Sequence, residues 1–383
     1  MGVFYVPTKI ASGVGSVRSL GDEIENLGAR KPLIMTDAGI ASAGIPEKVI
    51  GALESQNRKC EVFDGIEADP RIRSVVDAAQ VIKRGGHDIL IALGGGSSMD
   101  TAKGASILAV NELDLRDYQG VRESYPNTPL PIIAIPTTAG TGSEVSRATI
   151  IIDEEKEFKM FLASPELRSK AVFLDADLLV GIPSSIAAAT GVDALTHAME
   201  SYLSPNRTFV SEAASLEAVR LIFSNLRAFV ANTKNLERAQ NMLEASCLAG
   251  IGMSSGLGLI HSLAHPVGVK CGISHGLACA LFLPHVLRFN WPVAPDQYRR
   301  MALAIDWRIC SEFLSERDIA LQVVAEVETL LEDIGIPKRL SDINKSLGDA
   351  ADVVDEAYGS FLNLINPRPA TKEEVEMLVR EVV

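Results

Sequence analysis

The first half of the chain alternates short apolar runs with stretches of helical periodicity. Runs that are apolar along their whole length predict strands buried on both faces, and helical segments separate them. The predicted strands are 31–37, 60–66, 88–96 and 130–138, and the predicted helices between them are 45–56, 74–84 and 97–110. Buried strands that alternate with helices are typical of a parallel sheet covered on both sides. The first half therefore predicts a doubly wound α/β domain.

The second half has a different pattern, because strand-like runs disappear after the segment 171–183. Helical periodicity then dominates to the C-terminus, with predicted helices at 184–202, 211–231, 236–253 and 256–269. We place the change next to Gly181, which predicts an α/β domain over 1–181 and an all-α domain over 182–383. The length of 383 residues agrees with two domains, since a single core stops growing at roughly 250–300 residues.

Composition and charge exclude several classes of partner. A formal net charge of −13 argues against nucleic acids and anionic membranes. The five cysteines are scattered and form no CxxC pair, as expected for free thiols in a reducing compartment. The N-terminus lacks a basic segment before an apolar run, and nothing approaches the roughly 18 apolar residues of a membrane helix. We therefore expect a cytoplasmic protein, and the acidic stretch 153–157 predicts a solvated turn.

A strand that runs into glycines is the best candidate phosphate site. Residues 88–96 read DILIALGGG, and a predicted helix follows from Ser97. Glycines let the backbone approach a ligand closely, and a helix N-terminus presents unpaired N–H groups and partial positive charge to a pyrophosphate. The segment is neither GxGxxG nor a P-loop, so a simple strand-to-helix turn is the alternative.

Two further features support a dinucleotide site. The stretch 136–144, PTTAGTGSE, also follows an apolar strand and is rich in hydroxyls, and ligands of open parallel sheets bind beyond the carboxyl ends of strands. Asp37 ends the strand 31–37, where a carboxylate accepts hydrogen bonds from an adenosine ribose and favours NAD over NADP. A helix N-cap is an equally good interpretation of Asp37.

The histidine spacing in the second half suits a metal. Asp193-x3-His197 and His261-x3-His265 each place two donors on one face of a helix, and His275 follows. Three imidazoles and a carboxylate suit Fe(II), Zn(II), Mn(II) or Ni(II), whereas Ca(II) prefers all-oxygen shells. Either pair alone is more often an ordinary helix pair. Their occurrence in one predicted domain favours a metal site.

Four long motifs resemble the signatures of the iron-containing (group III) alcohol dehydrogenases. They are GGGSSMDTAK, PTTAGTGSE, GVDALTHAMESY and GLIHSLAHPVGVKCGISHGLACALFLPHV, and the resemblance runs from FYVPTKIASGVGSV to INPRPATKEEVEML. It implies an N-terminal dinucleotide-binding α/β domain with a parallel sheet and an all-α C-terminal metal-binding domain, the dehydroquinate synthase-like fold.

Matched motif to motif, the resemblance implies specific roles. Asp193, His197, His261 and His275 take the metal-ligand positions, normally for Fe(II), with Zn(II) or another divalent metal as alternatives. His265 takes the position of a non-ligand histidine close to the substrate. Cofactor-binding positions are Gly95, Gly96, Ser97, Asp100, Thr137, Thr138, Thr141 and Ser143, with Lys159 near the cofactor ribose and Leu178 in a segment of the same pocket.

The activity expected from this resemblance is reversible hydride transfer between NAD(H) and a small primary alcohol or aldehyde, by a homodimer or higher homo-oligomer. His265 is the candidate proton relay, and a packed or purely supporting histidine is the alternative.

Two other functions stay open. One is a metal- and NAD-dependent lyase or synthase of the same superfold, although segments 184–205 and 254–285 carry only Lys270 as a cation to bind an anionic substrate. The other is a non-catalytic cofactor-binding protein that kept the fold.

Overall fold

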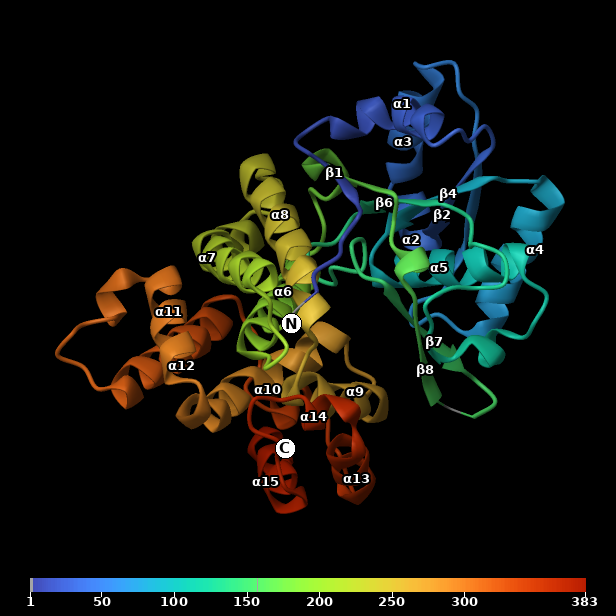
Figure 1. Ribbon diagram of the computed structural model, residues 1–383. Helices are drawn as coiled ribbons and strands as arrows, with labels where there is room; N and C mark the ends of the chain where they lie inside the picture. Colours follow the sequence, from blue (N-terminus) through green and yellow to red (C-terminus); the bar gives the residue numbers. More distant parts are fainter. Residues whose placement is uncertain (1–2, 157) are drawn as a thin grey trace. The chain divides into compact units, whose positions relative to one another are not determined.

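The computed structural model describes residues 3–156 and 158–383, which divide into two compact units (Figure 1). One unit is Tyr5–Val180, and the other is Gly181–Val383 together with Val3 and Phe4. Each unit is described by itself below.

Within the described residues, the unit Tyr5–Val180 is built on a six-stranded, wholly parallel sheet with the order β1-β9-β6-β4-β2-β3. Its strands are β1 Lys9–Ser12, β2 Pro32–Asp37, β3 Glu61–Ile66, β4 Ile89–Gly94, β6 Ile132–Pro136 and β9 Ala171–Leu174. The strands predicted at 31–37, 60–66, 88–96 and 130–138 are confirmed. The sheet order crosses between strands distant in the chain, as a doubly wound fold requires.

Helices cover both faces of this sheet. The α-helices are α1 Leu20–Asn26, α2 Ala38–Ser42, α3 Ile45–Glu54, α4 Ile72–Gly85 and α5 Gly96–Val110, and short 3-10 helices lie at Ser16–Ser19, Leu115–Tyr118, Pro165–Leu167 and Ala176–Leu178. Alternate residues of the central strands, such as Ile91 and Ile133, share a buried core with Ile24 of α1 and Val49 of α3. Helix α5 packs against β2, β4 and β6, whose intervening side chains, such as Leu90, are also fully buried.

A second, small sheet was not expected from the sequence. It has the order β5-β8-β7, with β5 Gly120–Val121 parallel and β7 Ala148–Asp153 antiparallel to β8 Phe158–Ala163. Asp153 is almost fully buried and accepts a hydrogen bond from Arg116 Nε at 2.8 Å, so the acidic stretch 153–157 begins in a strand rather than in a solvated turn. Residues 154–156 form the turn, and Glu157 lies outside the described residues.

The strand-like segment 171–183 forms a strand only as far as Leu174. The carboxylate of Asp175 accepts hydrogen bonds from the backbone N–H groups of Asp177, Gly15 and Val17 at 3.1, 2.9 and 3.1 Å. These bonds cap a 3-10 helix at Ala176–Leu178 and tie it to the start of the chain. The strand therefore stops at Leu174, although the sequence stays largely apolar, because the buried carboxylate of Asp175 turns the backbone into a 3-10 helix.

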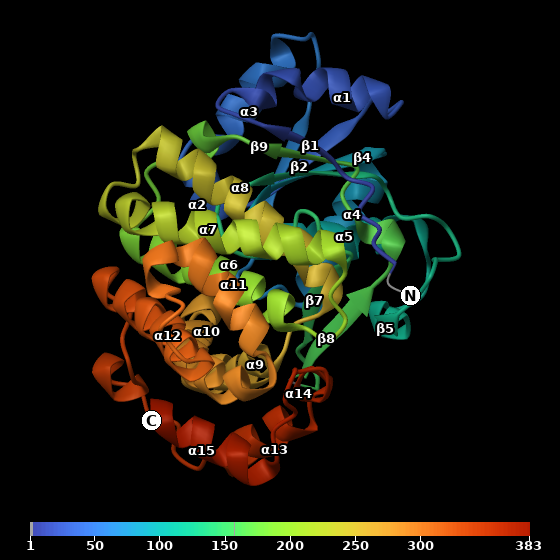
Figure 2. The same cartoon turned by 60° about the vertical axis from the view of Figure 1, so that its left-hand side comes forward.

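The unit Gly181–Val383 is helical throughout its described residues. Its α-helices are α6 Ser184–Leu203, α7 Phe209–Ala231, α8 Leu236–Gly252, α9 Leu259–Cys271, α10 His275–Asn290, α11 Pro295–Ile305, α12 Glu316–Asp333, α13 Ala351–Gly359, α14 Phe361–Leu364 and α15 Lys372–Val382. Helix α10 packs against both α6 and α9. Helices α13, α14 and α15 lie together at one end of this unit in Figure 1 and Figure 2.

Among the described residues, no single helix is long and apolar enough to cross a membrane. The bent pair Leu236–Ser255 and Leu259–Cys271, which meet at 110°, passes a test of length and composition only when the two are taken together.

Candidate metal centre and glycine turn

Helix α6 carries three polar side chains on one buried face. Asp193, His197 and Glu200 follow one another at intervals of four and three residues, so they point the same way from the helix. Each is at most 4% exposed, although the other side chains that α6 buries are mostly apolar. A polar row of this kind is costly to bury unless its members bind one another or a ligand.

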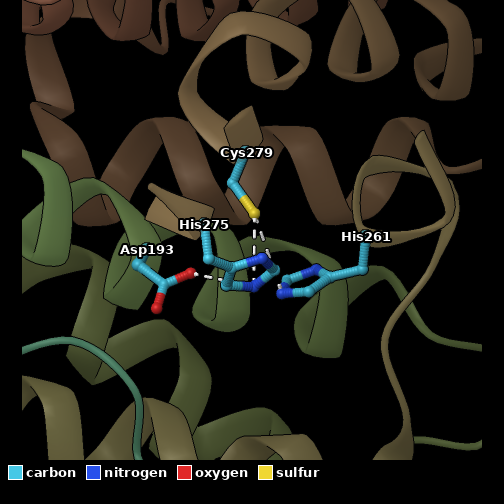
Figure 3. Close-up of side chains that lie close together, drawn as sticks. All are labelled: Asp193, His261, His275 and Cys279. Atoms are coloured by element: carbon cyan, nitrogen blue, oxygen red, sulfur yellow. Dashed lines mark hydrogen bonds and ion pairs between the residues drawn. The ribbon is translucent and has the colours of Figure 1, made fainter. Parts of the chain in front are cut away.

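Helices α9 and α10 bring further donors to the same place. The imidazole rings of His197 and His261 stack at 4.8 Å between centroids, and those of His261 and His275 lie 5.1 Å apart. Ligand atoms of Asp193, His261, His275 and Cys279 all lie within 4.8 Å of one another (Figure 3). Three helices thus converge on one cluster. Asp193, His261 and His275, three of the four predicted metal ligands, belong to it, and His197 lies beside it with its Nε2 3.9 Å from Asp193 Oδ1.

The surroundings of Asp193 indicate that this cluster can bind a cation. Its Oδ1 atom is buried and has no hydrogen-bond partner among the described residues, while it lies 3.6 Å from His275 Nε2 and 3.9 Å from His197 Nε2. Burial raises the pKa of Asp193. A divalent ion held by carboxylate and imidazole would satisfy such an oxygen, so the donor set fits a transition metal.

Glu200 orients one of these imidazoles. Its Oε2 lies 2.5 Å from Nδ1 of His261, and its Oε1 accepts a hydrogen bond from Ile260 N at 2.6 Å. A carboxylate beside Nδ1 favours the tautomer that carries hydrogen there and leaves Nε2 free to bind a metal. Burial lowers the pKa of His261 well below its ordinary value, so the ring is neutral. Burial also raises the pKa of Glu200 to about 7.

His265 lies beside the cluster rather than inside it. Its ring centroid is 5.8 Å from that of His261 and 5.3 Å from that of His275, and it is only partly buried. A partly accessible imidazole near a metal site suits proton transfer, which stays a prediction here.

Glu200 and Cys279 are not among the site residues predicted from the sequence. Glu200 lies seven residues after Asp193, and Cys279 four residues after His275, so helical spacing placed both on the faces that carry ligands. Asp193 and the three histidines already make a complete set of four donors, and five scattered cysteines without a CxxC pair give no signal that one of them lies beside a metal site. All five cysteines are free in the structure.

The glycine turn lies between β4 and α5. Gly94 has a φ of 149°, and a Cβ there would lie 2.2 Å from Ser98 Oγ. A Cβ on Gly95 would lie 3.2 Å from Thr138 Oγ1, and one on Gly96 would lie 3.1 Å from Cγ2 of Thr141. The two predicted cofactor loops therefore contact each other at the N-terminus of α5, and only glycine leaves that helix end open.

A buried ion network holds the second loop to α5. Lys103 Nζ donates to the backbone oxygens of Ser143 and Ala148 at 2.7 and 2.8 Å, and to Ser143 Oγ at 2.9 Å. Ser143 Oγ in turn donates to Asp100 Oδ1 at 3.0 Å, and Asp100 Oδ2 accepts from Ile150 N at 3.1 Å. Burial lowers the pKa of Lys103 to about 8 and raises that of Asp100. Asp100 and Ser143 thus make structural contacts that position the loop.

The remaining predicted cofactor residues have varied surroundings. Asp37 caps α2, because its Oδ1 accepts from Gly39 N and Ile40 N at 2.8 and 3.0 Å. Asp37 is therefore a helix N-cap, as one of its two interpretations predicted. Its other oxygen, Oδ2, takes no part in the cap and is available to a ligand. Ser97 is partly buried, and its backbone oxygen accepts from Thr101 Oγ1 at 2.8 Å. Thr137 is buried, and its hydroxyl has no hydrogen-bond partner among the described residues. The ammonium group of Lys159 lies 3.5 Å from the carboxylate of Asp69. Leu178 packs in the hydrophobic core of the sheet.

Comparison with known proteins identifies the class. Residues 7–176 match the model of the iron-containing alcohol dehydrogenases, and residues 187–383 match that of the C-terminal part of the same family. The chain is 35% identical to the 1,3-propanediol dehydrogenase of Klebsiella pneumoniae over 381 residues, 99% of this chain and 98% of that protein. It is 36% identical to the lactaldehyde reductase of Escherichia coli (strain K12) over 367 residues, 95% of this chain and 94% of that protein.

Solved structures of the same family also resemble this chain over its whole length. A 1,3-propanediol oxidoreductase superposes with a TM-score of 0.95 at 35% identity and covers 99% of both chains. The sulfoacetaldehyde reductase of Bifidobacterium kashiwanohense, in complex with NAD+, superposes with a TM-score of 0.90 at 26% identity, over 99% of this chain and 98% of that one. The chain belongs to the iron-containing alcohol dehydrogenase family and is an oxidoreductase of that family, whose members use a divalent metal and NAD.

Proposed function

We propose that this protein is a metal-dependent alcohol dehydrogenase that transfers hydride reversibly between NAD(H) and a small primary alcohol or aldehyde. The observation that carries the proposal is the cluster of donors on α6, α9 and α10, buried except for the partly exposed His275, with an oxygen of Asp193 that has no hydrogen-bond partner among the described residues. In this proposal Asp193, His197, His261 and His275 hold the ion. Iron(II) is the family's metal by name, and zinc(II) suits the same donors.

The chain's own residues would position the reaction. When bound, the ion acts as a Lewis acid on the substrate oxygen, and the nicotinamide exchanges the hydride. Glu200 keeps Nε2 of His261 directed at the cluster, and Asp193 supplies negative charge to balance the cation. His265 would receive the hydroxyl proton and pass it towards solvent, a task suited to its partial burial.

The unit Tyr5–Val180 would bind NAD. The open N-terminus of α5 suits the pyrophosphate, because its first N–H groups have no partner within the helix. Thr138 and Thr141 contact that end, and the free oxygen of Asp37 suits a ribose hydroxyl. A carboxylate there would repel a 2′-phosphate, which favours NAD over NADP. The predicted domains 1–181 and 182–383 would thus be the NAD-binding and metal-binding parts.

The proposed substrate is small and uncharged. Relatives are named for propanediol, lactaldehyde and methanol, all small uncharged molecules with a hydroxyl or aldehyde, and two others are named for sulfoacetaldehyde, a small aldehyde that carries a sulfonate. The metal-bearing helices α6, α9 and α10 carry two cationic side chains, Lys270 and Arg288, both near helix C-termini and away from the donors. This favours the dehydrogenase over a lyase or synthase of anionic substrates. A homodimer or higher homo-oligomer in the cytoplasm, without nucleic-acid or membrane partners, completes the proposal.

Metal removal and reconstitution test the proposal. The full chain, stripped by a chelator under anaerobic conditions, should lose NADH formation with butanol and propanediols and NADH consumption with short aldehydes. Both activities should return with Fe(II) or Zn(II). His261→Ala should lose bound metal and activity together. His265→Ala should keep its metal and lose about 100-fold or more in kcat, the usual contribution of one proton-transferring group.

The same variants can also contradict the proposed function. A metal-free His261→Ala variant with full activity would rule out the metal site. If His265→Ala loses its metal, His265 is a ligand and not the proton relay. Intact metal with no NADH change on any alcohol or aldehyde would favour the lyase or the non-catalytic protein.

A further inference from the structure

Cys279 lies among the metal donors. It follows His275 by one helical turn on α10 and is fully buried. Its sulfur lies 3.6 Å from His275 Nε2 and 3.9 Å from His261 Nε2. Figure 3 shows the sulfur pointing at the two imidazoles from α10. No other cysteine occupies a comparable place among the described residues.

These separations match those of ligands that share one ion. In a tetrahedral zinc site with metal–nitrogen and metal–sulfur bonds of about 2.05 and 2.3 Å, nitrogen and sulfur lie about 3.6 Å apart. The two measured distances of 3.6 and 3.9 Å are close to that value.

The cluster therefore contains two overlapping sets of four donors. Asp193, His261 and His275 are common to both sets. Cys279 on α10 completes the set whose ligand atoms all lie within 4.8 Å of one another. His197 on α6, the fourth ligand predicted from the sequence, lies beside that set with its Nε2 3.9 Å from Asp193 Oδ1. Three nitrogen ligands and a carboxylate give a harder site than one in which a thiolate joins them.

We propose that Cys279 coordinates the divalent ion as a thiolate and shifts the preference of the centre from Fe(II) towards Zn(II) and Co(II). The inference rests on the proposed metal site. On binding, the thiol proton leaves to solvent, a sulfur–metal bond forms and no electron is transferred. Thiolate ligands favour zinc over the harder divalent ions, which gives the shift its direction.

Spectroscopy of the intact protein tests the sulfur directly. Zinc-edge X-ray absorption of the zinc-loaded full chain should contain a sulfur scatterer at about 2.3 Å. Cobalt(II)-loaded protein should have a sulfur-to-cobalt charge-transfer band in the near ultraviolet. Cys279→Ser should lose that band but keep the visible cobalt bands, since the other donors remain. Cys271→Ser, which removes a cysteine outside the cluster, should keep both.

Metal competition tests the selectivity. The ratio of zinc to iron(II) affinity should fall in Cys279→Ser and stay unchanged in Cys271→Ser. Wild-type protein that binds zinc and cobalt without any sulfur signal overturns the inference and leaves the proposed function intact. Wild-type protein that binds no divalent ion at all overturns the proposed metal site itself. The X-ray measurement needs no variant, so a misfolded Cys279→Ser would not prevent a decision.

Discussion

Single side chains decide whether the cluster binds a metal or is merely a group of buried polar residues. Burial lowers the pKa of His261 and raises those of Asp193 and Glu200, so without an ion the cluster favours neutral forms. A divalent cation would favour the ionised carboxylates of Asp193 and Glu200, because it supplies a positive charge next to these two buried side chains. The contact between Glu200 and Nδ1 of His261 then fixes which nitrogen faces the ion.

Glu200→Gln tests this contact at the scale of one residue. The amide keeps the size of the side chain but removes the charge beside His261, and metal affinity should fall about 10–100-fold, as for other outer carboxylates of metal sites. Competition with a chromophoric chelator measures the change. Glu217→Gln, which alters a partly exposed glutamate paired with Arg220 on α7, is the matched control and should leave the affinity unchanged. Equal affinities in all three proteins would remove Glu200 from the metal site.

At the scale of elements, the close crossing of α6 and α10 sets the geometry of the metal cluster. A Cβ on Gly276 would lie 2.2 Å from the backbone oxygen of Ala189 and 3.2 Å from the Cβ of Asp193. Only a glycine allows the two helices to approach this closely, and this approach sets the distance between Asp193 and the donors of α10. A backbone oxygen within a helix cannot move aside as a flexible side chain can.

Gly276→Ala should therefore separate the helices. We expect a loss of about 1–3 kcal/mol in the free energy of unfolding, the usual cost of overpacking, together with weaker metal binding. Urea unfolding and chelator competition measure the two effects. Gly268→Ala on α9 is the control, because its Cβ would meet neighbours at an ordinary 3.6 Å. Gly276→Ala as stable as the control would contradict the close approach.

Individual elements also show what periodicity predicts and what it misses. The apolar runs that became β2, β4 and β6 are buried along their whole length, so their pattern was unambiguous. Strand β7 alternates between buried and half-buried residues and was missed. The apolar segment 171–183 looked like one long strand, yet Asp175 ends it through hydrogen bonds to Gly15 and Val17, about 160 positions earlier. No local pattern reports such a contact.

At the scale of the whole molecule, the candidate sites are divided between the two units. Every donor of the metal cluster lies in Gly181–Val383, whereas the glycine turn and its ion network lie in Tyr5–Val180. Since a ligand stabilises the structure that binds it, each ligand should stabilise its own unit first.

Hydrogen exchange of the full chain tests this division. Added Zn(II) should slow amide exchange in α6, α9 and α10 and leave the N-terminus of α5 nearly unchanged. Added NAD should slow exchange at residues 95–100 and 137–142, where the two loops meet. Equal protection of α5 by Zn(II) alone would show that the metal does not bind only at the proposed cluster.

The amino-acid sequence by itself determined the long helices, the central strands β2, β3, β4 and β6, and the helix faces on which Asp193 and His197 lie, because helical and strand periodicity are local properties. Its motifs also determined the family. Only the tertiary structure decided which faces meet. It brought Glu200 against His261 and Cys279 against the imidazoles, from helices more than 50 residues apart in the case of Glu200. The physical reason is that a donor set depends on how helices pack, and spacing within one helix carries no information about its neighbour.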